Sequence, residues 1–178
     1  MKRTLAGWTA CALVATAALS SCATFEEDSN VAVVNGTELS EETLAQMAES
    51  DMMSRVFQSP PTGGVIDGGE LRSLLRVWAL YEIYDQTGLL DEATKEQARA
   101  QLATEFGDSW ESAPAEIREL AARSGALSAL DNQGVLDPTV LQNAERDAVV
   151  RIDPKYGYWD AATTSIQPIG VAGPVAGG

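Results

Sequence analysis

The sequence predicts a mainly α-helical domain of about five helices, in which two short β-strands, near residues 31–34 and 149–152, pair the ends of the domain. Aromatic residues make up only 6% of an alanine-rich chain, a composition that favours helices over sheet. Apolar residues recur at helical spacing through most of residues 40–148. One β-branched run precedes this helical region and a second follows it.

A turn signal separates the first predicted strand from the first predicted helix. Residues 31–34 are β-branched or small, and the Asn35-Gly36 pair that follows is typical of a tight turn. Ser40 can cap a helix that carries two glutamates in its first turn and runs to about Gln58. Residues 59–69 contain two prolines and four glycines, so we expect a loop there.

The second predicted helix spans residues 69–87. Asp67 and Glu70 have the spacing of a capping box at its start, and Gly88 is a plausible stop. Its apolar residues cover most of its circumference, so we expect a central and largely buried helix. The aromatic residues expected in the core on this helix are Trp78, Tyr81 and Tyr84.

Three further helices are predicted by their start signals. Asp91 can cap a helix that runs to about Phe106, and Ser112 with Pro114 can open the next one. Asp137-Pro138 combines a capping residue with a proline at the first helical position, which starts the fifth helix.

The pattern changes after this last helix. Residues 149–152 are typical of a strand, and residues 153–157 of a turn. Residues 161–178 are mostly small residues, glycine and proline, and predict a disordered tail. The domain is therefore expected to span residues 31–160.

The first 21 residues predict a lipoprotein signal peptide. Lys2 and Arg3 precede an uncharged apolar run, residues 10–19, that is too short to span a bilayer. Leu19-Ser20-Ser21-Cys22 then resembles the bacterial lipobox, whose cysteine receives a diacylglyceryl group before cleavage on its amino side. We expect a lipid on Cys22, an acidic tether over residues 22–30, and a location on the outer face of the cell membrane. An ordinary secretory peptide with a chance cysteine is the alternative.

The charge of the chain limits its partners. The sequence holds 26 acidic and 12 basic residues, for a formal net charge of −14. This excess argues against binding nucleic acid or anionic lipid through the protein surface. We therefore expect the protein to contact the membrane only through the lipid on Cys22.

Catalytic chemistry has few candidates in this composition. The chain has no histidine, and Cys11 leaves with the signal peptide, so no free thiol remains once Cys22 is lipidated. Ser-His-Asp and Cys-His catalysis and His or Cys zinc sites are thereby excluded. We expect no cofactor, no metal and no enzymatic activity, although a pair of carboxylates remains as a third possibility.

The two ends of the predicted domain resemble a known family. Residues 31–36, Val-Ala-Val-Val-Asn-Gly, lead into a capped helix at Ser40. Residues 153–160, Asp-Pro-Lys-Tyr-Gly-Tyr-Trp-Asp, form an aromatic, glycine-containing turn after the last strand. In this order, on a lipoprotein, they resemble the SurA/PrsA-like N-terminal chaperone domain of actinobacterial lipoproteins.

The resemblance implies a SurA N-terminal-like fold and a chaperone-like role in the cell envelope. Many relatives also carry a parvulin-type prolyl isomerase domain, whose site characteristically uses histidines. This chain leaves no room for such a domain after Asp160 and contains no histidine. We therefore expect the chaperone module without isomerase activity.

Two groups of side chains are candidates for binding clients. Methionine adapts to irregular partners, so the methionines of the first helix could line an apolar groove, with ordinary core packing as the alternative. The aromatic turn could expose a binding patch or could cover the strand pair. The candidates are Met47, Met52, Met53, Val56, Phe57, Tyr156, Tyr158 and Trp159.

The function expected from these observations is reversible binding of unfolded or partly folded exported polypeptides by a membrane-anchored domain. The alternative is an adaptor or structural lipoprotein that binds one folded envelope protein.

Overall fold

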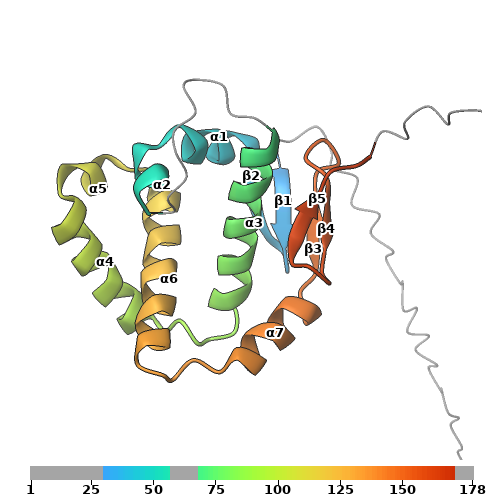
Figure 1. Cartoon of the computed structure of the whole chain (residues 1–178). Coiled ribbons are helices and arrows are strands. Elements are labelled where there is room, and N and C mark those ends of the chain that lie inside the picture. Colours follow the sequence, from blue (N-terminus) through green and yellow to red (C-terminus); the bar gives the residue numbers. More distant parts are fainter. Residues whose placement is uncertain (1–29, 57–67, 171–178) are drawn as a thin grey trace, which may run out of the picture.

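A three-stranded antiparallel sheet joins the two ends of the folded chain, and helices pack on one side of it (Figure 1). The computed structural model describes residues 30–56 and 68–170. The predicted signal peptide, Cys22, the predicted tether up to residue 29, residues 59–67 of the predicted loop and residues 171–178 lie outside this part. Within it the chain forms seven helices and five strands, so the fold is mainly helical as predicted.

The sheet confirms the predicted pairing of the domain ends. β1 (Asn30–Val34) lies between β2 (Thr37–Ser40) and β3 (Val150–Ile152), with Ala32 opposite Ile152 and Val34 opposite Val150. Asn35 turns the chain between β1 and β2 at φ +48°. Its side-chain oxygen also accepts a hydrogen bond of 2.7 Å from the Val149 backbone N–H, which ties the turn to β3.

The single helix expected from Ser40 to Gln58 is wrong, because two helices fill this segment. Ser40 does cap α1 (Glu41–Glu49), since its Oγ accepts from the Thr43 N–H at 3.1 Å. Ser50 then adopts an extended backbone, and α2 (Asp51–Val56) follows in a new direction. The break lets α1 pack on the sheet while α2 packs on α5 and α6.

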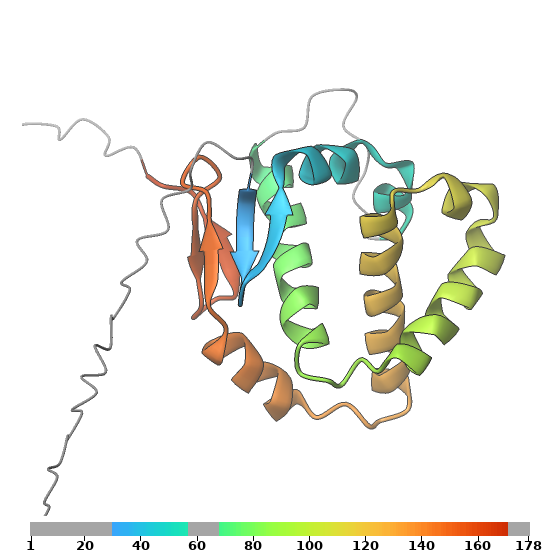
Figure 2. The ribbon, with the colours of Figure 1, turned by 180° about the vertical axis from the view of Figure 1, so that it is seen from behind.

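α3 (Gly68–Asp85) is the central helix, with the sheet on one side and helices α4 to α6 on the other (Figure 2). Trp78 is buried, as predicted, whereas Tyr81 and Tyr84 are half-buried and donate hydrogen bonds through their hydroxyls. Tyr81 donates to Ser124 Oγ at 2.9 Å, and Tyr84 donates to the Glu145 carboxylate on α7 (Pro138–Asp147). Burial and this hydrogen bond raise the pKa of Tyr84.

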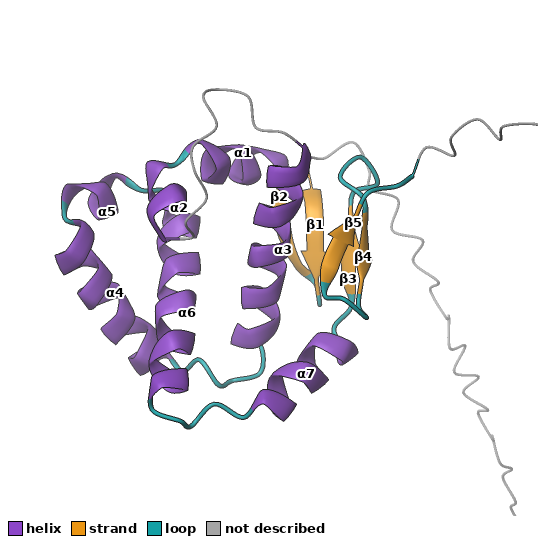
Figure 3. Ribbon diagram, viewed as in Figure 1, coloured by secondary structure: helices purple, strands orange, loops and turns teal. Residues whose placement is uncertain are grey.

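Two of the remaining predicted helix starts are confirmed by side-chain caps, whereas Ser112 belongs to a separate short helix and Pro114 alone precedes the fourth predicted helix. Asp91 caps α4 (Glu92–Phe106) and Asp137 caps α7, each through a hydrogen bond from a backbone N–H two or three residues later. α6 (Ala115–Asn132) follows Pro114, and a short α5 (Asp108–Ser112), which was not predicted, stands before it (Figure 3).

α4 and α6 approach each other closely through small residues. A Cβ placed on Gly125 of α6 would lie 3.1 Å from the Cβ of Ala98 on α4. Gly125 therefore serves this close contact, and α6 continues through it as one helix.

The expected disordered tail is wrong for residues 161–170. β4 (Tyr158–Asp160) and β5 (Ser165–Gln167) form an antiparallel hairpin, and Ile166 on β5 is 7% exposed. Arg76 of α3 holds the hairpin, because its Nε donates to the Thr164 carbonyl at 2.7 Å. The segment is ordered by these tertiary contacts, which its composition does not reveal.

Candidate functional site

A cluster of ion pairs links α3, α4 and α6 on the side of the molecule away from the sheet. Glu82 of α3 is only 6% exposed, and Arg123 Nη1 of α6 lies 2.6 Å from its carboxylate. Arg123 Nη2 lies 3.1 Å from Asp85, and its Nε lies 3.4 Å from Glu119 without hydrogen-bond geometry. The buried carboxylate of Glu82 also accepts from Gln86 Nε2 at 2.9 Å.

Two cations of α4 extend this cluster toward the surface. Lys95, 9% exposed, lies 3.0 Å from Asp85 and 3.2 Å from Glu92. Arg99 contacts three carboxylates, those of Glu92 at 2.5 Å, Glu96 at 3.0 Å and Glu119 at 2.6 Å. Each of these cations therefore has its charge matched by neighbouring acids.

The electrostatics keep the cluster charged. Burial alone would lower the pKa of Lys95, but its hydrogen bonds to Asp85 and Glu92 outweigh this and raise it. Hydrogen bonds to Glu119 and Glu92 raise the pKa of Arg99, and the same pairing lowers that of Glu92. These groups therefore stay charged near neutral pH, and their ion pairs connect three helices. A catalytic acid–base pair would instead need a group whose pKa lies near neutral pH.

A shallow groove of about 410 Å³ lies beside the cluster, between α4 and α6, and α5 bounds it. Its apolar surface comes from alanines and from Trp110, which is 7% exposed. Its charged rim comes from both long helices. The lining residues are Glu96, Arg99, Ala100, Ala103, Trp110, Ala115, Arg118 and Glu119.

Arg118 differs from the other cations of this region. It is half-buried on the first turn of α6, and it makes no ion pair with any residue that the structure describes. Arg99, across the groove, is by contrast saturated by three carboxylates. Arg118 is thus a groove cation whose charge the described part of the chain leaves uncompensated.

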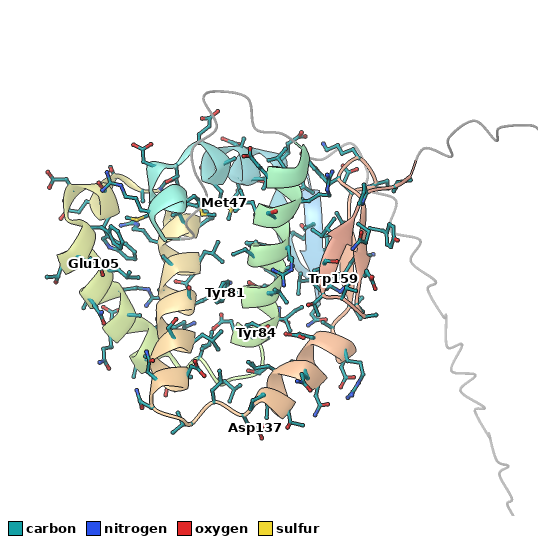
Figure 4. The ribbon with its side chains drawn as sticks, viewed as in Figure 1. Met47, Tyr81, Tyr84, Glu105, Asp137 and Trp159 are labelled. Carbon is teal, nitrogen blue, oxygen red and sulfur yellow. The ribbon has the colours of Figure 1, made fainter. Side chains whose placement is uncertain are left out.

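Of the two possibilities for the methionines, core packing and an apolar groove, the structure fits core packing. Met47, Met52 and Met53 are at most 7% exposed, and Met47 lies inside, where α1 meets α3 and α6 (Figure 4). Val56 ends α2, and Phe57 lies outside the described residues. The methionines pack in the core because α1 and α2 turn their apolar faces toward α3 and α6.

The aromatic turn does not form one exposed patch. Tyr156 and Trp159 are half-buried against the core, and only Tyr158 is exposed, at 53%. Lys155 lies over the Tyr156 ring, with its Nζ 5.1 Å from the ring centroid and 2.9 Å from Glu41. These contacts fasten the turn to α1, which fits the structural alternative for the aromatics.

The sequence did not single out the groove residues. The signal available was charge spacing, because Glu92 and Lys95, Glu96 and Arg99, and Glu119 and Arg123 stand three or four residues apart on their helices. That spacing predicts pairs on one helix surface. It cannot show that two such surfaces face each other with Trp110 between them.

The described residues offer no metal site and no membrane-spanning helix. Within residues 30–56 and 68–170, no three histidine, cysteine or acidic side chains gather where they could hold a metal ion, and no helix is long and apolar enough to cross a membrane. No family model, curated protein or solved structure matches the chain.

Proposed function

We propose that this chain is a lipid-anchored, non-catalytic polypeptide-binding protein of the cell envelope. The observation that carries the binding role is the open groove between α4 and α6, where alanines and Trp110 offer apolar surface beside charged rims. Such a mixture of apolar floor and a few polar groups suits a segment of another polypeptide. The chaperone-like resemblance of the two domain ends supports the same class of function.

The anchor and the groove are compatible with each other. Lipid on Cys22 would be joined to Asn30, the first residue of β1, by a short tether. The groove lies beyond α3 from β1, so the sheet would face the anchor while the groove stays open to partners (Figure 1).

Replacement of Cys22 by alanine should release the protein from the membrane. The variant lacks the sulfur that accepts the lipid, and one hydrophobic signal run does not anchor a chain stably. Fractionation with labelled palmitate measures this: the unmodified chain should carry label in the membrane fraction, and the variant should not. A variant that keeps both label and membrane location would contradict lipidation at Cys22.

Replacement of Ala100 by tryptophan should abolish binding of polypeptides. Ala100 is exposed and lines the groove, so an indole there fills the groove without entering the core. The measurement is suppression of aggregation of a chemically denatured reporter protein, followed by light scattering with the full chain in detergent. The unmodified chain should suppress aggregation, and Ala100→Trp should not.

The matched control is Ala93→Trp, which places the same side chain on an exposed residue of α4 outside the groove lining. This variant should behave like the unmodified chain. Equal suppression by both variants would show that the groove is not the binding site.

A single folded partner is the second candidate, and the burial of the methionines favours it. With Met47, Met52 and Met53 in the core, the part of the chain that the structure describes has no methionine-rich surface of the kind that suits many unrelated clients. Cross-linking in the native envelope separates the two. One stoichiometric partner would support an adaptor, and many unrelated exported proteins would support a chaperone.

A further inference from the structure

We propose that the groove selects polypeptide segments that carry an acidic side chain next to apolar residues, and that Arg118 pairs with the carboxylate of that side chain. This inference rests on the proposed polypeptide-binding function and names the chemistry of its ligand. The observation behind it is the difference in charge compensation among the cations of α4 and α6.

The cations around the groove are matched by acids, with one exception. Lys95, Arg99 and Arg123 each lie within 4 Å of at least two carboxylates. Arg118 has no such partner in the described part of the chain, although acidic residues outnumber basic ones by 26 to 12. In so acidic a protein, an unmatched arginine beside a groove is the point where a carboxylate from outside can enter an ion pair.

The acids on the groove rim do not oppose such a ligand strongly. Glu96 and Glu119 both contact Arg99, at 3.0 Å and 2.6 Å, which offsets part of their negative charge. The wider negative charge of the protein is screened over about 8 Å at physiological ionic strength, whereas a contact inside a partly buried groove is screened less. Arg118 is therefore the one cation of the groove lining that pairs with no described carboxylate and can pair with one from a ligand.

The rest of the lining specifies what accompanies the carboxylate. Ala100, Ala103 and Ala115 leave space, and Trp110, 7% exposed, adds a small apolar area to the floor. A planar guanidinium can bind a carboxylate through two parallel hydrogen bonds while a neighbouring aliphatic side chain of the ligand lies against the alanines. The groove is open, so the occupant is an internal segment of a chain and its carboxylate comes from a side chain.

The experiment compares short peptides that differ only in their charge. The first is blocked at both ends, rich in alanine and leucine, and has one central glutamate, and the second has glutamine in its place. A third has the glutamine and a free carboxyl terminus. Affinities for the full chain in detergent are measured by fluorescence anisotropy at physiological salt.

The glutamate peptide should bind about tenfold or more tightly than the glutamine peptide, as expected for a charge-assisted hydrogen bond. Arg118→Gln should remove this preference, so that the two peptides bind with equal affinity, and Arg118→Lys should restore part of it. The matched control is Arg151→Gln, because Arg151 is exposed on β3, away from the groove, and likewise makes no ion pair with a described residue. It should bind both peptides like the unmodified chain.

The remaining outcomes separate this inference from the proposed function. If the glutamate and glutamine peptides bind equally and Ala100→Trp abolishes both, the groove binds polypeptides but the role of Arg118 is wrong. If the carboxyl-terminal peptide binds more tightly than the glutamate peptide, the assignment to a side chain is overturned. If no peptide binds, both proposals fail.

Discussion

Replacement of Arg123 by leucine should lower the free energy of unfolding by about 3–5 kcal/mol, the usual cost of removing one partner of a buried ion pair. Arg123 lies 2.6 Å from Glu82 and 3.1 Å from Asp85. Without Arg123, the carboxylate of Glu82 stays buried, at 6% exposure, and loses its counter-charge. It keeps only the hydrogen bond from the Gln86 amide. Chemical denaturation, followed by circular dichroism, measures the loss.

Two further variants test whether the loss of stability comes from the burial of the ion pair. Arg146→Leu removes an ion pair whose side chains are 68% and 70% exposed, and it should cost less than about 1 kcal/mol. The double variant Glu82→Leu with Arg123→Leu should recover much of the stability, since apolar residues replace both charges. Equal losses for Arg123→Leu and Arg146→Leu would contradict the role assigned to the buried pair.

Replacement of Gly157 by alanine should destabilise the protein by about 3 kcal/mol and detach β5 from β4. Gly157 has φ +133°, which side chains rarely adopt, and a Cβ there would lie 2.2 Å from the Gln167 carbonyl oxygen. That oxygen belongs to backbone in β5, so the strand itself must move. Loss of Ile166 from the core would follow.

Hydrogen exchange of the β5 amides, together with denaturant unfolding, checks this expectation. The matched control is Gly134→Ala, because Gly134 also has a positive φ, of +67°, but a Cβ there meets nothing within 4 Å. It should cost only about 1–2 kcal/mol from the backbone conformation. If Gly157→Ala lowers the free energy of unfolding no more than Gly134→Ala does, the close approach of β5 is not what excludes a side chain at residue 157.

The starts of the helices could be predicted from local sequence signals, but the break within the first predicted helix could not. Ser40, Asp91 and Asp137 cap their helices as predicted, because a side-chain oxygen that accepts from the first free N–H groups is a local interaction. The helix break at Ser50 carries no glycine or proline. It follows from packing, since α1 contacts the sheet and α2 contacts α5 and α6.

The candidate site was much less accessible to prediction. The methionines were visible as a group in the sequence, but their helical spacing fits a buried face as well as an exposed one. The groove depends on Trp110, on a short α5 that was not predicted, and on α4 and α6 lying close enough for Gly125 to face Ala98. None of these is a property of a single segment.

The mainly helical fold and the pairing of residues near 31–34 with those near 149–152 could be predicted from the sequence alone, and the lipobox at Cys22 stays a prediction. These depend on periodicity, capping residues and the order of local signals. Only the tertiary structure decided that Glu82 is buried, because Arg123, 41 residues away, supplies its counter-charge. It likewise decided that Arg118 faces a groove without a carboxylate of its own, since charge compensation depends on which helices meet.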